Sequence, residues 1–208
     1  MTITQKLWES NYDLALLSLN TKFVQGIKKG DLPKTKFQEY LAQDYFFLES
    51  FARAYGLAVS KSRNIKNIKT LSVLLSGVSE ELILHETYAK EWDIDLTTNL
   101  IGPATKKYTD FLEEVCLNSS LIEIMSAMTP CMRLYSWLGK KLLNMISDNP
   151  YKDWILTYSD ESFNNLAKSL ENLIDEYDEY YDIDQVAFLY KRAMELELDF
   201  FNAYSSFS

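Results

Sequence analysis

Residues Pro33 to Lys61 read PKTKFQEYLAQDYFFLESFARAYGLAVSK, and their pattern is the clearest indication of the fold. Pro33 suits an early position in a helix, where the missing N–H of proline does no harm. The large apolar side chains recur at spacings of three and four, which is the period of one helical face: Phe37, Tyr40, Leu41, Phe47, Leu48, Phe51 and Tyr55. The stretch therefore predicts one long helix, from about residue 33 to residue 61, with an aromatic face turned to the core.

The rest of the chain favours helices as well. Only six glycines and four prolines occur in 208 residues, and Leu, Ala, Glu and Lys dominate the long segments between them. We expect further helices at 4–18, 22–29 (ended by Gly30), 65–91 (bent or interrupted near Gly77), 104–117, 120–147, 151–158, 160–180 and 184–204, with a loop over 93–103. The prediction is an all-α helical bundle that forms a single domain over residues 1–208.

Composition narrows the classes of function. The net charge is −9, which disfavours a nucleic-acid partner because such proteins need a basic face against the phosphates. We find no apolar run of 18 residues, so we expect no membrane span. The first residues lack a signal-peptide core, and two cysteines do not suggest a disulfide framework. We therefore expect a cytoplasmic protein with free thiols.

Two acidic residues lie on apolar stripes. Asp44 shares the stripe of the helix at 33–61, and Glu197 lies among Tyr190, Phe200 and Tyr204 in the last helix. A buried carboxylate is costly unless it is paired, and apolar surroundings raise its pKa toward the range useful for acid–base chemistry. For Asp44 a structural ion pair is the alternative to a ligand-binding role. For Glu197 the alternative is a position at the edge of the helix, from which the side chain reaches water.

Cys131 and Tyr135 lie four residues apart on the stripe of the helix at 120–147, so their side chains meet on one face. Pro130 precedes the cysteine and removes one helical hydrogen bond. A buried cysteine is often no more than a small apolar side chain. Together with Asp44 and Glu197, however, Cys131 would complete an apolar pocket with a few convergent polar groups.

Other kinds of site find little support in the sequence. His85 is the only histidine, and the acidic residues beside it suggest an exposed or helix-edge position. We find neither the ligand spacing of a zinc site nor the Glu-x-x-His motifs of a di-iron bundle. Nothing supports haem ligation by His85, and no glycine-rich phosphate loop is present. We therefore expect a site without metal or cofactor.

At these residues the chain resembles the TenA family, which is also called thiaminase II or aminopyrimidine aminohydrolase. The resemblance extends over nearly the whole chain, and its most specific piece, which contains Cys131, places the chain in the cysteine-containing class. The matching motifs are Phe23-x-x-x-Ile27-x-x-Gly30-x-Leu32, Phe37-x-x-Tyr40-x-x-Gln43-Asp44-Tyr45-x-Phe47-Leu48, Glu81-x-x-x-His85 with Tyr88 and Trp92, Pro103 to Tyr108-Thr109-x-Phe111-Leu112, Pro130-Cys131-x-x-x-Tyr135-x-x-x-Gly139, Trp154-Ile155-x-x-Tyr158 with Phe163, and Glu197-x-x-Phe200-Phe201-x-x-Tyr204. Phe201 stands where the family usually has tryptophan, which keeps an aromatic wall.

The resemblance implies a haem-oxygenase-like fold without haem, often assembled as a homotetramer, and hydrolysis of aminopyrimidines or thiamin in thiamin salvage. It implies that Cys131 is the nucleophile and Glu197 the acid and base. Asp44 would accept hydrogen bonds from the 4-amino group, and Phe47 would stack on the ring. Tyr108, Tyr135 and Tyr158 would orient the substrate and the thiolate.

Two other hypotheses remain at this point. A regulatory or binding protein of the same type would keep the pocket without using the thiol. A different enzyme on the same fold could act on another small heterocycle or use a metal, although one histidine makes the metal version less favoured.

Overall fold

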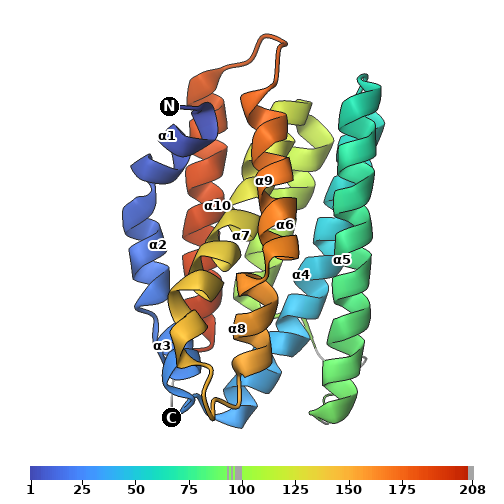
Figure 1. Cartoon of the computed structure of the whole chain (residues 1–208). Coiled ribbons are helices and arrows are strands. Elements are labelled where there is room, and N and C mark those ends of the chain that lie inside the picture. The colour runs from blue at the N-terminus through green and yellow to red at the C-terminus, as the bar shows by residue number, and fades with distance from the viewer. Residues whose placement is uncertain (93, 95, 97–99, 206–208) are drawn as a thin grey trace.

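The computed structural model describes residues 1–92, 94, 96 and 100–205, apart from the side chains of Leu84, Tyr88 and Glu91. The expected loop over 93–103 and the motif residue Tyr88 therefore lie partly outside the described residues. The described chain consists of helices and short connections (Figure 1). In order these are α1 Ile3–Ser10, α2 Tyr12–Leu19, α3 Lys22–Lys29, α4 Lys34–Lys61, α5 Ile65–Glu91, α6 Pro103–Asn118, α7 Leu121–Leu142, the 3₁₀ turn η1 Leu143–Met145, α8 Lys152–Ser159, α9 Glu161–Asp175 and α10 Ile183–Ala203.

The long helices run roughly side by side, with α7 in the middle of the bundle (Figure 1). Helix α4 packs on α5 and α6, while α7 packs on α8, α9 and α10. Almost every residue of α7 between Leu121 and Tyr135 is buried, because other helices cover it on most sides. The predicted all-α bundle is confirmed. No described helix combines the length and the apolar character needed to cross a bilayer.

The first helix predicted at 4–18 is in fact two helices that meet at Asn11. The backbone of Asn11 leaves the helical region (φ −116°, ψ 13°), and its side-chain amide donates to the carbonyl of Leu7 at 2.8 Å. Asparagine side chains compete in this way with the helical hydrogen bonds of the main chain. The prediction of one continuous helix was wrong for this local reason.

The helix predicted at 160–180 ends at Asp175 instead, just before a run of further acidic residues. Negative charges at a helix C-terminus oppose the helix dipole, which discourages extension. The Asp175 carboxylate also accepts from the backbone and the hydroxyl of Thr4 at 2.9 and 2.8 Å. The end of α9 is thereby fixed to the start of α1.

Gly77 does not interrupt α5, which runs unbroken from Ile65 to Glu91. A Cβ atom added at Gly77 would lie 3.1 Å from a methyl group of Leu166 on α9. The glycine therefore allows α9 to approach α5 closely. The expected interruption at this position was therefore wrong.

Candidate active site

Helix α4 carries the predicted residues Asp44 and Phe47 on its buried face. Asp44 is 3% exposed, and its Oδ2 atom lies 2.7 Å from Nε2 of His85 on α5. The Phe47 ring centroid lies 4.7 Å from that of Tyr108 on α6. Asp44 is therefore in a buried ion pair, the alternative that the sequence left open, and the pairing itself does not exclude a role in ligand binding.

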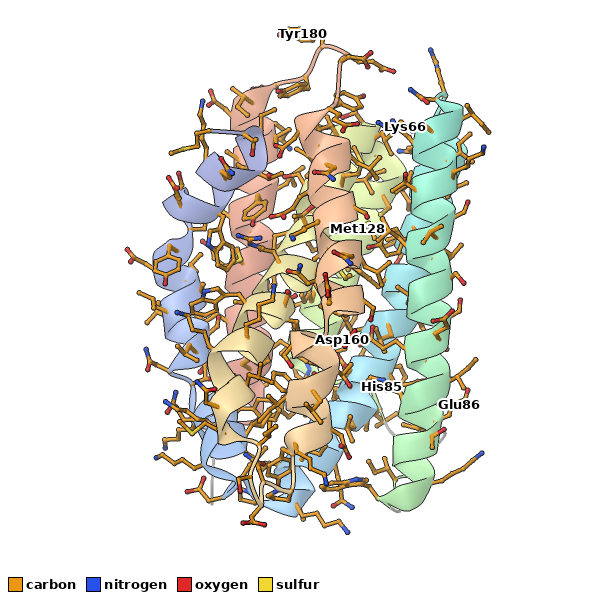
Figure 2. The ribbon with its side chains drawn as sticks, in the orientation of Figure 1. Lys66, His85, Glu86, Met128, Asp160 and Tyr180 are labelled. Carbon is orange, nitrogen blue, oxygen red and sulfur yellow. The ribbon has the colours of Figure 1, made fainter. Side chains whose placement is uncertain are left out.

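His85 is buried, not exposed as we expected from its acidic neighbours. It lies on the side of α5 that faces α4, whereas Glu86 points to the opposite side (Figure 2). Successive residues of a helix differ in direction by about 100°, so a charged neighbour in sequence says little about burial. The better signal was the spacing of Glu81 and His85, which are four residues apart and share one face.

Both ring nitrogens of His85 face acceptors. Nε2 faces the Asp44 carboxylate, and Nδ1 lies 3.0 Å from the backbone carbonyl of Glu81. Burial lowers the pKa of His85, but the hydrogen bond and charge of Asp44, aided by the charge of Glu81, outweigh it and raise the pKa to about 9. At neutral pH this residue is therefore an imidazolium that donates from both nitrogens.

Glu197 on α10 is enclosed, with 1% of its surface exposed. The Tyr108 hydroxyl donates to its Oε1 atom at 2.8 Å. Burial raises the pKa of Glu197 to about 8, against hydrogen bonds from Tyr108 and Cys131 that lower it. The carboxyl group is thus mostly protonated at neutral pH, which is the state a general acid requires.

Cys131 on α7 is half-buried although core residues surround it. Helix α7 continues through Pro130 without a break. Burial raises the pKa of the Cys131 thiol well above its usual range, and the charges of Glu197, Glu81 and Asp44 raise it further. The thiol is therefore protonated at rest, and its interaction with the Glu197 carboxyl group raises its pKa further while lowering that of Glu197.

The predicted tyrosines belong to a connected aromatic wall. The ring centroids of Tyr135 and Tyr158 are 4.7 Å apart, and Tyr135 lies 5.4 Å from Phe201. The Tyr40 hydroxyl donates to that of Tyr135 at 3.3 Å and accepts from the Trp154 indole at 3.2 Å. This chain of contacts restrains the rings from α4, α7, α8 and α10.

Gly139 fixes the approach of α8 to α7. A Cβ atom at this position would lie 2.4 Å from the carbonyl carbon of Tyr158 and 2.5 Å from the nitrogen of Ser159. Only glycine allows the two backbones to come so close. Since Gly139 lies one turn after Tyr135, this contact sets the distance between the Tyr135 and Tyr158 rings.

Glu81 is a site residue to which the sequence gave no role. The Tyr158 hydroxyl donates to its Oε1 atom at 2.8 Å. Burial raises the pKa of Glu81 to about 7, and the charge of Asp44 adds to this against the opposite effect of His85. The motif Glu81-x-x-x-His85 held the signal, because its spacing places both side chains on the face of α5 that meets α4.

The structure brings the seven predicted site residues into one region of the bundle. Glu197 contacts Tyr108 and Cys131, while the charge of Asp44 influences the pKa values of both Glu197 and Cys131. Tyr135 and Tyr158 close the region on the side of α8. Among the described residues, no three His, Cys, Asp or Glu side chains are grouped in a way that could hold a metal ion.

Comparison with known proteins gives a consistent match. The model of the TENA/THI-4/PQQC family matches residues 16–206. An aminopyrimidine aminohydrolase of Halalkalibacterium halodurans is 36% identical over 179 residues, covering 83% of this chain and 77% of that protein. The bifunctional TH2 protein, mitochondrial, of Arabidopsis thaliana is 32% identical over 224 residues, covering 95% of this chain. This chain spans only 36% of the length of the plant protein.

Solved structures share the fold. A TenA homologue from P. horikoshii OT3 is 24% identical with a TM-score of 0.91, and the match covers 98% of each chain. Haem oxygenase-2 from Synechocystis sp. PCC 6803 is 17% identical with a TM-score of 0.62, over 98% of this chain and 85% of that one. The expected haem-oxygenase-like fold is confirmed.

Proposed function

The chain belongs to the TENA/THI-4/PQQC family, and we propose that it is a hydrolase of thiamin salvage that acts on aminopyrimidines. Its substrate would be 4-amino-5-aminomethyl-2-methylpyrimidine, and its products the 5-hydroxymethyl compound and ammonia. The name of the Halalkalibacterium relative supports the class of reaction. The observation that carries the proposal is the enclosed carboxyl group of Glu197, which is held by Tyr108 and interacts with the Cys131 thiol.

The chemistry explains why a thiol and an acid are needed together. An amino group on the methylene carbon of an aromatic ring is a poor leaving group while the ring stays aromatic. Addition of sulfur at C6 of the pyrimidine interrupts the aromatic system, and the ring nitrogen can then push the amine out. Protonation of that ring nitrogen makes the addition easier.

Glu197 can serve both proton transfers of the addition step. Its carboxyl group gives a proton to the ring nitrogen, and the carboxylate so formed takes the thiol proton as sulfur bonds to carbon. The proton of Cys131 in effect reaches the ring through Glu197. A free thiolate in the resting protein is then unnecessary, which agrees with the raised pKa of the Cys131 thiol.

Recognition of the substrate would fall to Asp44. Its Oδ2 atom is held by His85, and its carboxylate can still accept from the 4-amino group. A site of this kind rejects an analogue without the amino group, because the buried acceptor would lose a hydrogen bond. Phe47 would stack on the ring, with Tyr108, Tyr135 and Tyr158 around its edge.

Replacement of Cys131 tests the proposal. We expect the wild-type protein to release ammonia and the hydroxymethyl product from the aminomethylpyrimidine, and Cys131→Ala to release neither. Cys116→Ala is the matched control, since Cys116 is the other cysteine and lies buried in α6 away from the carboxylates. We expect that variant to keep wild-type turnover in a coupled ammonia assay.

Two outcomes would contradict the proposal. One is a wild-type protein that turns over neither the aminomethylpyrimidine nor thiamin, and the other is full turnover by Cys131→Ala. Tight binding of the pyrimidine without any product would favour a binding or regulatory protein instead. The homotetramer and the cytoplasmic location stay predictions, and sedimentation of the purified protein tests the first.

A further inference from the structure

Glu81 lies between two hollows on the surface of the bundle. The Trp92 hollow is lined by Phe37, Trp92, Trp154, His85, Glu81 and Thr157. The Gly77 hollow is lined by Gly77, Met132, Asp160, Phe163, Glu81 and Thr157. Figure 2 shows Asp160 where α8 passes into α9, beside the second of these hollows. Glu81 borders both hollows and is half-buried, so its carboxyl group can exchange protons with solvent.

The other side of Glu81 faces the proposed active site. The Tyr158 hydroxyl donates a hydrogen bond to the Glu81 carboxyl group, and the main-chain carbonyl of Glu81 accepts one from Nδ1 of His85. The charges of Glu81 and Asp44 both raise the pKa of the Cys131 thiol. The Glu81 carboxyl group is therefore close enough to interact electrostatically with both Asp44 and Cys131.

The order of atoms around the pyrimidine ring indicates which part of the substrate would lie near Glu81. If Asp44 binds the 4-amino group and sulfur attacks C6, the methylene carbon on C5 must lie between these two points. Glu197, which serves the ring nitrogen beyond C6, is then on the far side of the thiol. In this arrangement Glu81, whose carboxyl group is held by Tyr158, would lie on the side where the amine leaves and water attacks.

Tyr55 adds an independent observation about this region. Its side chain is fully buried, and its hydroxyl group has no hydrogen-bond partner among the described residues. An unsatisfied buried hydroxyl costs about 1–3 kcal/mol, so the group calls for a partner such as a bound water or ligand. Burial raises the pKa of this hydroxyl well above its usual range, and Cys131 and Glu81 in their ionised forms would raise it further. Its position suits a donor to a water or leaving group between the two.

We propose that Glu81 is a second proton-transfer residue, which protonates the departing amine and then deprotonates the attacking water. This inference rests on the proposed function and adds a residue to it. One carboxyl group cannot serve both ends of the reaction, because the ring nitrogen and the methylene carbon lie on opposite sides of the sulfur.

The step balances as follows. The carbon–nitrogen bond breaks with its electron pair on nitrogen, and Glu81 supplies the proton, so that neutral ammonia leaves. The Glu81 carboxylate then takes a proton from water as the water oxygen bonds to the methylene carbon. Glu81 ends in its initial state, and the sum is amine plus water giving alcohol plus ammonia. The Gly77 hollow, which Glu81 lines, gives the released ammonia a route to solvent.

Glu81→Gln tests the inference, because glutamine can still accept from Tyr158 but cannot carry a proton. We expect kcat for the aminomethylpyrimidine to fall by about 10²–10⁴-fold, the usual effect of losing an acid–base group, with little change in KM. Wild-type activity should decline as pH rises through about 7, where Glu81 loses its proton, and this decline should be absent from the residual activity of the variant. The titratable groups that face Glu81 are Asp44, His85, Cys131 and Tyr158, and Glu80, Asp153 and Asp160 line the two hollows beside it.

The control variant is Glu80→Gln, which alters the neighbouring exposed carboxylate of the same hollow and should keep wild-type kcat. A Glu81→Ala variant should regain activity when formate is added, whereas a purely structural role would show no rescue. Should Glu81→Gln fail to fold, the formate experiment decides. Wild-type kcat in Glu81→Gln, beside an inactive Cys131→Ala, would overturn the inference and leave the proposed function intact. An inactive wild-type protein would instead remove the proposed function itself.

Discussion

Glu197 and Glu81 are two buried acids of one site that differ in their access to water. Glu197 is enclosed at 1% exposure and receives a hydrogen bond from Tyr108, whereas Glu81 is half-buried and receives one from Tyr158. Burial is the main cause of the raised pKa in each case, to about 8 for Glu197 and about 7 for Glu81. Two glutamates, each with a tyrosine partner, thus lie in different surroundings, one enclosed and one at the border with solvent.

This contrast explains how one site can hold two acids that transfer protons in different steps. An enclosed acid exchanges protons only with what is bound beside it, here the ring and the Cys131 thiol. An acid that borders solvent can regain its proton from water between turnovers, and water can reach the site beside it. Distinct surroundings separate the titration of similar groups, which is how a fold assigns separate acid–base roles.

Replacing Glu197 should produce the largest effect. We expect Glu197→Gln to lower kcat by about 10²–10⁴-fold, because the ring nitrogen loses its acid. Glu197 acts in its protonated form, so wild-type activity should be lost as pH rises through about 8, and this dependence should vanish in the variant. The decline near pH 7 that we assign to Glu81 should remain.

The measurement is a pH profile of kcat for both proteins. Glu195→Gln serves as the control, since Glu195 lies on the same helix but pairs with Arg192 at 3.0 Å outside the site. An unchanged profile in Glu197→Gln would mean that the enclosed acid plays no part in proton transfer.

Removing His85 should have the next largest effect, on stability. His85→Asn leaves the buried Asp44 carboxylate without its cation, and breaking such a pair costs about 3–5 kcal/mol. The folded pKa of His85 is raised from 6.5 to about 9, so its contribution is complete below 6.5 and lost as pH rises through about 9. The destabilisation should therefore be greatest at neutral and mildly acidic pH.

Urea unfolding at several pH values measures this effect. Lys107→Ala provides the comparison, because its ion pair with Asp199 is exposed on both sides and worth about 0–1 kcal/mol. Equal losses in the free energy of unfolding of the two variants would contradict the view that His85 and Asp44 form a buried ion pair in which each charge needs the other.

Gly139→Ala should have the smallest of these effects and should act on the Glu81 side alone. The added methyl group overlaps the backbone of Tyr158, and overpacking of this kind costs about 1–3 kcal/mol. Displacing α8 would also move the hydroxyl that holds Glu81. Thermal unfolding measures the stability, and kcat reports the site.

Gly56→Ala on α4 is the matched control for this substitution. A Cβ atom at Gly56 has nothing within 4 Å, so alanine should raise stability by about 0.5–1 kcal/mol through helix propensity. A Gly139→Ala protein as stable as Gly56→Ala would show that the close contact of α7 and α8 is unimportant.

Most of the helices were predicted from the sequence. The errors arose where a side chain competed with a helical hydrogen bond, or where a residue far away in the sequence fixed the end of a helix. The aromatic spacing in residues 33–61 was sufficient for α4, whose observed bounds are Lys34–Lys61. The break at Asn11 depends on a side-chain hydrogen bond that helical periodicity does not contain. The end of α9 depends on the acidic residues after it and on Thr4, which lies far away in the sequence.

Spacing in the sequence is sufficient to show which side chains share a helical face: Asp44 with Phe47, Cys131 with Tyr135, and Glu81 with His85. The period of a helix is a local property, so these sets need no knowledge of the rest of the fold. The packing of the helices, in contrast, buries His85 against Asp44 as a charged pair, and it encloses Glu197 while leaving Glu81 at the border with water. Burial and pairing depend on what neighbouring helices bring to a face, and one helix's sequence does not contain that information.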